Sequence, residues 1–251
     1  TAGTARIFHT AAGKDVELTG PYGWKIDVAG EVQALAALIQ AGPAAGPVDR
    51  EPVYAMTAAS RTAPDWGNTY AEVDLTGQHV YMFQEGNLVW DAPCVTGNIS
   101  KNYDTPAGIY SLTYKEKDRI LRGAKKADGT YEYESHVDYW MPFNGGIGFH
   151  DASWRSSFGG SIYKNGGSHG CVNMPYDKAK ELFENVYAGM PVICYDLPGT
   201  ESKKSSQSSG RAPQETTAPA QTAPAPTQAP PANPPVPPES LPPETLPSEA
   251  V

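Results

Sequence analysis

From Tyr70 onward, apolar and polar side chains alternate along the chain. Ala71, Val73 and Leu75 are separated by polar neighbours, and further apolar runs at 80–83 and 88–90 flank a turn-like segment. A period of two places alternate side chains on opposite faces of a strand, so these residues predict a β-hairpin or meander. Further strands are expected at 92–96, 108–115, 135–140 and 190–195. The pattern therefore predicts a mainly-β, sandwich-like domain.

Near the N-terminus the apolar period changes to that of a helix. Apolar residues recur at helical spacing at Val28, Val32, Leu35, Leu38 and Ile39. Asp27 is a suitable N-cap, and Gly42-Pro43 provides an end signal. We expect a helix here whose apolar stripe faces a protein core.

A second helix is expected late in the chain. It starts near Asp177, after Pro175, and is closed by Gly189. Its apolar positions are Ala179, Leu182, Phe183 and Val186.

Composition divides the 251 residues unevenly. Of the 24 prolines, 14 follow Leu197, and the segment 198–251 contains no aromatic residue. Such a segment cannot bury enough apolar surface to offset its ordering entropy, so we expect a disordered Pro/Ser/Thr-rich tail. A spacer is the favoured interpretation of this tail, with an O-glycosylated stalk or a ligand for a partner domain as alternatives.

Charge and hydropathy narrow the range of partners. The formal net charge is −9, and no segment has the basic surface of a nucleic-acid-binding protein, so no nucleic acid is expected as a partner. No apolar run approaches the ~20 residues of a membrane span. The chain begins at Thr1 without an initiator Met or a signal-peptide pattern, and we interpret it as a form that has lost an N-terminal targeting segment. Membrane attachment is expected only through such a missing N-terminal anchor.

The strongest chemical signal is Ser168-His169-Gly170-Cys171-Val172-Asn173, with His150 located 21 residues before the cysteine. A cysteine acts as a nucleophile through its thiolate, which a nearby imidazole can generate by accepting the thiol proton. The glycines allow the backbone to approach a substrate carbonyl, where N–H groups can stabilise an oxyanion. Cys94 and Cys194 lie in apolar, strand-like runs and are interpreted as small buried side chains, with a disulfide between them as the alternative.

This motif, together with Thr105-Pro106-Ala107-Gly108-Ile109-Tyr110, Tyr139-Trp140-Met141-Pro142-Phe143 and the run from Gly145 to Asp151, resembles the L,D-transpeptidase (YkuD-type) catalytic domain. The resemblance covers 67–197 and implies a β-sandwich with a few helices. Less distinctively, residues 1–60 resemble the C-terminal part of the peptidoglycan-binding-like domain that precedes this catalytic domain in Gram-positive members, with 51–66 as the connector.

The resemblance also implies an activity. Cys171 would attack a tetrapeptide stem of peptidoglycan, release the terminal D-alanine and pass the acyl group to an amine, which forms a 3→3 cross-link. No cofactor and no metal are implied. The enzyme is expected to be a monomer that acts on stem peptides outside the cell, in the wall or at the outer face of the cytoplasmic membrane.

Residue roles follow from the same resemblance. His150 would be the general base, while His169 would shape the pocket, tune the thiol or assist the oxyanion site. Ser168 and Asp151 are candidates for orienting an imidazole. The backbone N–H groups of Gly170 and Cys171 are the expected oxyanion donors, and Asn173 would bind either the substrate or the loop.

Three alternatives stay open at this point. His150, His169 and Cys171 are all competent zinc ligands, although no CxxC or HExxH pattern accompanies them. An L,D-carboxypeptidase or another cysteine peptidase would share the first half-reaction and use water instead of an amine. A non-catalytic wall-binding module is the third alternative.

Overall fold

The computed structural model describes residues 1–42 and 46–197, so the tail predicted at 198–251 lies outside the described residues. Two larger sheets form the body of the protein. The first has the strand order β7-β6-β5-β13-β8. Its strands are β5 (Tyr70–Asp74), β6 (His79–Gln84), β7 (Asn87–Pro93), β8 (Gly108–Ser111) and β13 (Pro191–Tyr195).

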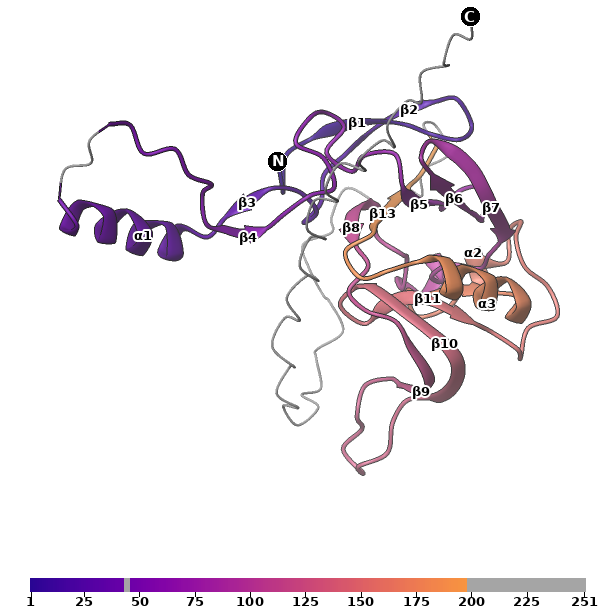
Figure 1. Cartoon of the computed structure of the whole chain (residues 1–251). Coiled ribbons are helices and arrows are strands. Elements are labelled where there is room, and N and C mark those ends of the chain that lie inside the picture. The colour runs from indigo at the N-terminus through magenta and orange to yellow at the C-terminus, as the bar shows by residue number, and fades with distance from the viewer. Residues whose placement is uncertain (43–45, 198–251) are drawn as a thin grey trace, which may run out of the picture. The chain divides into compact units, whose positions relative to one another are not determined.

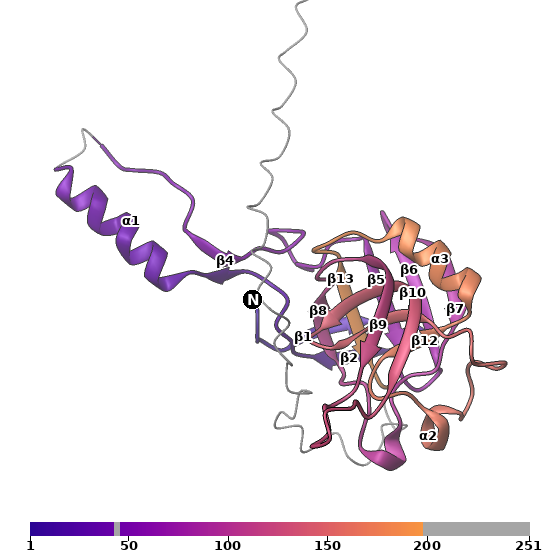
Figure 2. The same cartoon turned by 90° about the horizontal axis from the view of Figure 1, so that it is seen from below.

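The second sheet has the order β12-β11-β10-β9. Its strands are β9 (Glu116–Arg122), β10 (Glu134–Asn144), β11 (Ile147–Asp151) and β12 (Val172–Met174). Both sheets are visible in Figure 2, where β10 and β9 lie in front of β5 and β13. The hydrophobic core lies between them, because Val73 and Met82 of the first sheet belong to the same buried cluster as Met141 and Phe149 of the second. The predicted mainly-β sandwich is confirmed.

Most of the expected strands are present, with some differences. The strand expected at 92–96 is only the end of β7, which stops at Pro93, while β9, β11 and β12 were not expected as strands. β9 alternates poorly and consists largely of charged residues. β11 and β12 belong to glycine-rich stretches that are typical of loops, and they form because each pairs with a neighbouring strand.

Helix α3 (Tyr176–Asn185) starts directly after Pro175, as predicted. Its buried residues Ala179 and Leu182 join the main core together with Val186. The helix packs against β10 and β11, which Figure 1 shows beneath it. Two shorter helical segments are a 3-10 turn at Ile99–Lys101 and α2 (Tyr163–Gly166).

A two-stranded ribbon, β1 (Arg6–His9) and β2 (Asp15–Leu18), packs on the opposite face of the five-stranded sheet. The alternation along β13 makes this arrangement possible. Cys194 belongs to the core between the sheets, whereas Ile193 and Tyr195 belong to a second cluster with Phe8. Both faces of this sheet are therefore covered.

Helix α1 (Val28–Gln40) follows β3 (Lys25–Ile26), which pairs with β4 (Tyr54–Met56). The predicted N-cap is confirmed, because the Asp27 carboxylate accepts a hydrogen bond from the Gly30 N–H at 3.1 Å. The expectation that its apolar stripe faces a core is wrong. None of its residues is buried, and Val32 and Ile39 are 60% and 80% exposed. The helix is held instead through Glu31, which pairs with Arg50 and accepts a hydrogen bond from the Val53 N–H.

Among the described residues, no helix combines the length and apolar character needed to span a membrane.

Candidate active site

Two adjacent parallel strands place His150 and Cys171 on one face of the second sheet. β11 pairs with β12 in a register that sets Phe149 beside Val172 and His150 beside Asn173. Continuing the register by one residue sets Gly148 beside Cys171. Because side chains alternate along strands and paired positions share a face, the imidazole of His150 and the thiol of Cys171 lie on the same side. The distant histidine and the cysteine, 21 residues apart in sequence, are thus brought together by strand pairing.

The His150 imidazole has a defined tautomer. Its Nδ1 lies 2.7 Å from the backbone carbonyl oxygen of Asp151. A carbonyl oxygen can only accept a hydrogen bond, so Nδ1 carries the proton and Nε2 keeps its lone pair. Burial lowers the pKa of His150 to about 4. The indole rings of Trp140 and Trp154 contribute to this dry setting, with centroids 6.0 and 5.9 Å from the imidazole. His150 is therefore a neutral imidazole at physiological pH, with Nε2 able to accept a proton.

Cys171 is a half-buried free thiol directly before β12. Its Sγ donates to the carbonyl oxygen of Gly146 at 3.5 Å. Burial raises the pKa of Cys171 to about 11, which the Gly148 N–H offsets only in part. The resting pair is therefore a neutral thiol and a neutral imidazole, and the thiolate has to be generated as the reaction proceeds.

The loop before the nucleophile requires glycine at one position. Gly170 has φ +120°, and a Cβ there would lie 3.1 Å from the Ile147 side chain. The loop is closed by Ser168, whose Oγ donates to the Cys171 carbonyl oxygen at 2.6 Å and accepts from the Gly170 N–H at 3.0 Å. The Ser168 hydroxyl thus binds backbone groups and not an imidazole. It also occupies the Gly170 N–H, one of the two expected oxyanion donors.

The carboxylate of Asp151 is directed away from the histidine that its own backbone orients. Its Oδ1 accepts a hydrogen bond from the Tyr139 N–H at 2.8 Å. Burial raises the pKa of this carboxyl group above its ordinary value. The side chain therefore fastens β11 to β10, and the orienting group for His150 is the Asp151 backbone carbonyl.

Asn173 is buried beside His150. Its backbone N–H and carbonyl pair with Val95, both at 2.9 Å. Its side-chain Oδ1 is buried and has no hydrogen-bond partner in the described part of the chain. Asn173 is thus a buried amide at the β12 position that pairs with His150.

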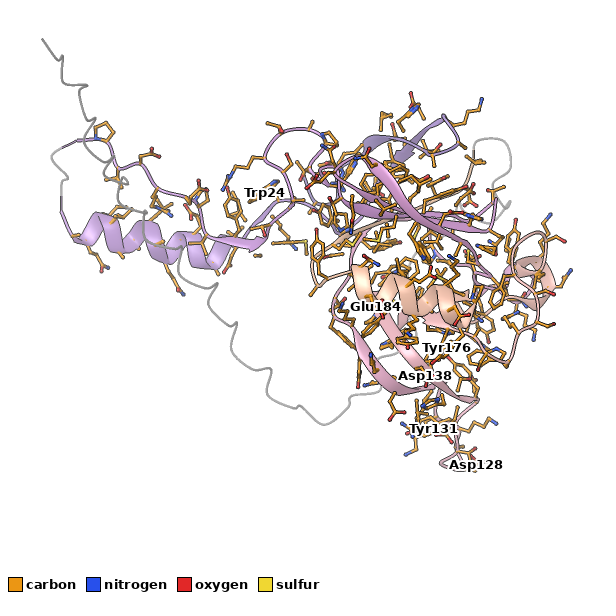
Figure 3. The ribbon with its side chains drawn as sticks, turned by 45° about the vertical axis from the view of Figure 1, so that its right-hand side comes forward. Trp24, Asp128, Tyr131, Asp138, Tyr176 and Glu184 are labelled. Carbon is orange, nitrogen blue, oxygen red and sulfur yellow. The ribbon has the colours of Figure 1, made fainter. Side chains whose placement is uncertain are left out.

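His169 lies in a different environment from His150. Its ring stacks on Tyr133 with centroids 4.6 Å apart and also contacts Tyr103 at 4.5 Å. Burial lowers the pKa of His169 as well. Tyr133 belongs to the hairpin that joins β9 and β10, at whose far end Figure 3 labels Asp128 and Tyr131.

Tyr133 is also close to the nucleophile. Burial raises the pKa of Tyr133 to about 12, and the negative charge that Cys171 can carry adds to this effect. Neither Tyr103 nor Tyr133 was expected at the site, because no spacing rule connects them with His169. The one sequence signal is the concentration of tyrosines before the 135–140 strand.

The other two cysteines are fully buried free thiols in the main core. The disulfide alternative for Cys94 and Cys194 is therefore wrong, and their interpretation as buried side chains holds.

In the ranges 1–42 and 46–197, no group of three or more His, Cys, Asp or Glu side chains is arranged to hold a metal ion.

Comparison with known proteins identifies a family and several solved structures that this chain resembles. Residues 68–194 match YkuD, the L,D-transpeptidase catalytic domain. A solved structure of a cysteine-to-serine variant of the Enterococcus faecium L,D-transpeptidase is 34% identical over 77% of this chain and 75% of that chain, with a TM-score of 0.62. The Ldtfm–avibactam carbamoyl enzyme is also 34% identical, over 77% of this chain and 74% of that chain, with the same TM-score.

A third solved structure is the catalytic domain of the E. faecium L,D-transpeptidase acylated by ertapenem. It is 42% identical over 51% of this chain and 98% of that chain, with a TM-score of 0.45. A search of curated proteins finds no match. The family match over half of the chain, together with the identity to the E. faecium enzyme, shows that this chain belongs to the L,D-transpeptidase family.

Proposed function

We propose that this L,D-transpeptidase forms 3→3 peptidoglycan cross-links with Cys171 as the nucleophile and His150 as the general acid and base. The observation that carries the proposal is the Asp151 carbonyl bond to His150 Nδ1, at 2.7 Å. It leaves Nε2 as the proton acceptor on the face that His150 shares with Cys171.

In the acylation step, Cys171 Sγ attacks the carbonyl carbon of the third stem residue while the thiol proton passes to His150 Nε2. The carbonyl oxygen becomes an oxyanion beside the Cys171 N–H. The tetrahedral intermediate collapses, the bond to the terminal D-alanine breaks, and the leaving amine takes the proton from His150. A thioester and free D-alanine result. Because both partners start neutral, proton transfer accompanies the attack and does not precede it.

Cross-linking reverses the proton transfers. An amine on a neighbouring stem attacks the thioester carbonyl carbon, and His150 Nε2 accepts the proton of that amine. The second tetrahedral intermediate expels the Cys171 sulfur, which regains the proton, and a new amide links the two stems.

Hydrolysis of the same thioester by water would make the protein an L,D-carboxypeptidase. The first half-reaction is identical, so the resting geometry serves both outcomes. We place the enzyme at the outer face of the membrane or in the wall, because the stem peptides are its proposed substrate and partner there, and we expect it to act as a monomer.

Mass spectrometry of muropeptides tests the proposal. Purified protein is incubated with disaccharide-tetrapeptides, and we expect cross-linked dimers together with released D-alanine. Cys171→Ala should give neither product. Cys194→Ala is the matched control, since it removes a buried core thiol and should keep the products.

Each alternative outcome has a defined meaning. Tripeptides with free D-alanine but without dimers would replace transpeptidation by carboxypeptidation. Dimers formed by the folded Cys171→Ala variant would refute the cysteine mechanism.

A further inference from the structure

The peptide group between Gly170 and Cys171 is fixed by a hydrogen bond from Thr105, which lies 65 positions before Gly170 in the sequence. The Thr105 hydroxyl donates to the Gly170 carbonyl oxygen at 2.6 Å. The Thr105 hydroxyl oxygen in turn accepts a hydrogen bond from the Gly97 N–H at 3.0 Å. Thr105 is only 5% exposed, so water does not compete for these bonds. A hydroxyl has one proton to donate. Because the Gly97 N–H is itself a donor, the Thr105 hydroxyl proton goes to the Gly170 carbonyl oxygen.

Gly97, the donor that orients this hydroxyl, is itself fixed to the catalytic loop. The Ser168 N–H donates to the Thr96 carbonyl and the Asn98 N–H donates to the Ser168 carbonyl, both at 2.9 Å. A Cβ at Gly97 would overlap the carbonyl oxygen of Tyr103, so the backbone there is closely packed. The backbone at Gly97, which donates to the Thr105 hydroxyl, is therefore held in place.

The direction of the Gly170 carbonyl determines the direction of the next N–H. In a trans peptide the C=O and N–H bonds point to opposite sides. With the Gly170 carbonyl held by Thr105, the Cys171 N–H must point away from Thr105. The Gly170 N–H is already bonded to Ser168 Oγ at 3.0 Å. Among the residues that the structure describes, no protein group accepts a hydrogen bond from the Cys171 N–H, which is therefore the donor left for an oxyanion.

We propose that Thr105 is a positioning residue for acyl transfer, whose hydroxyl holds the Gly170 carbonyl so that the Cys171 N–H is aimed at the substrate carbonyl oxygen. The proposal rests on the proposed cysteine mechanism and adds to it a residue outside the Ser168–Asn173 motif. Without the hydroxyl, the Gly170–Cys171 peptide can rotate, and the oxyanion loses an aligned donor. The rate of attack on a carbonyl should therefore fall. The rate of displacement at an sp³ carbon, which forms no oxyanion, should stay the same.

The test compares two reactions of the same thiol in intact protein. One is acylation by a carbapenem, which passes through an oxyanion, and the other is alkylation by iodoacetamide, which does not. Thr105→Val replaces the hydroxyl with a methyl group of similar size. We expect the acylation rate constant to fall about 10- to 100-fold, somewhat less than the ~10²–10³ lost when an oxyanion donor is removed outright. The alkylation rate of Cys171 should stay within about twofold of the wild-type rate.

Two further variants act as controls. Thr105→Ser keeps the hydroxyl and should restore most of the acylation rate. Thr10→Val is the matched control, because Thr10 is 2% exposed and its hydroxyl likewise donates to a backbone carbonyl and accepts from a backbone N–H, both of Lys14. It lies in the β1–β2 turn and should leave both rates unchanged. If Thr105→Val does not fold, Thr105→Ala carries the same expectation.

The outcomes separate this proposal from the one on which it rests. Unchanged acylation in folded Thr105→Val, or a parallel loss of acylation and alkylation, would overturn the positioning role while leaving Cys171 as the nucleophile. A wild-type protein that alkylates at Cys171 but neither acylates nor releases D-alanine would instead overturn the cysteine mechanism, and the role of Thr105 with it.

Discussion

Helices α1 and α3 have similar apolar stripes in sequence but different environments in the fold. In α3, Ala179 and Leu182 are fully buried, and the helix packs against β10 and against β11, which carries His150. In α1, no residue is buried, and Val32 is 60% exposed. Both helices form where the periodicity predicts them. The difference teaches that a stripe identifies which face is apolar, whereas burial of that face depends on a partner element that periodicity does not report.

The same difference separates the parts of the protein that should support catalysis from those that should not. α3 and β11 share one core, so a change in either should reach the site or the global stability. α1 is attached through Glu31, Arg50 and Val53, and its changes should remain local.

The largest contrast is expected from His150→Ala in β11. Loss of a positioned acid and base should slow acylation about 10²- to 10⁴-fold. Leu35→Ala in α1 is the control and should acylate at the wild-type rate. His169→Ala should lose less than His150→Ala, because His169 packs between Tyr103 and Tyr133 and no backbone carbonyl in the described part of the chain bonds its ring. Rate constants for carbapenem acylation measure all three, and a larger loss at His169 would move the base role to that residue.

Stability gives the next contrast. Leu182→Ala should lower the free energy of unfolding by about 2–5 kcal/mol, since it opens a cavity in the core beneath the site. Leu35→Ala, at a residue 46% exposed, should change it by less than about 0.5 kcal/mol. Urea unfolding of the two variants measures the difference. Equal losses would mean that the α1 stripe is covered in solution.

The pH dependence of stability tests the role of His150, which lies in β11. Burial lowers the folded-state pKa of His150 to about 4. The unfolded chain binds a proton below about pH 6.5, so stability should be complete above that pH and decrease as the pH falls toward 4. His150→Gln should lose this part of the pH dependence, whereas Leu35→Ala should keep it. Unfolding midpoints between pH 4 and 7 test the point, and a wild-type slope shared by His150→Gln would contradict it.

The local sequence pattern was sufficient to predict the elements that depend on contacts between residues close together in the sequence. The α1 cap at Asp27 and the start of α3 after Pro175 were both predicted in this way. β11 and β12 were missed because their glycines and short length resemble a loop, and only pairing across the sheet makes them strands.

The site shows the same limit. The residue types of His150 and Cys171 identified the chemistry, but the group that orients His150 is a backbone carbonyl, whose direction no side-chain pattern records. The bond from Thr105 to Gly170 joins segments 65 residues apart. Contacts of this kind are created by the folded topology, and the sequence contains no spacing that signals them.

The smallest effect is expected at the start of α1. Asp27→Ala removes the hydrogen bond to the Gly30 N–H and should destabilise the helix by about 0.5–2 kcal/mol. Because no α1 residue is buried, the loss should appear as faster amide hydrogen exchange within 28–40 and not as a lower global melting temperature. Asp27→Asn keeps an acceptor and should exchange as the wild type does, and acylation should be unchanged in both variants. A global melting temperature several degrees lower in Asp27→Ala alone would show that α1 unfolds together with the sandwich. The two helices would then differ in how exposed they are, but α1 would not unfold independently.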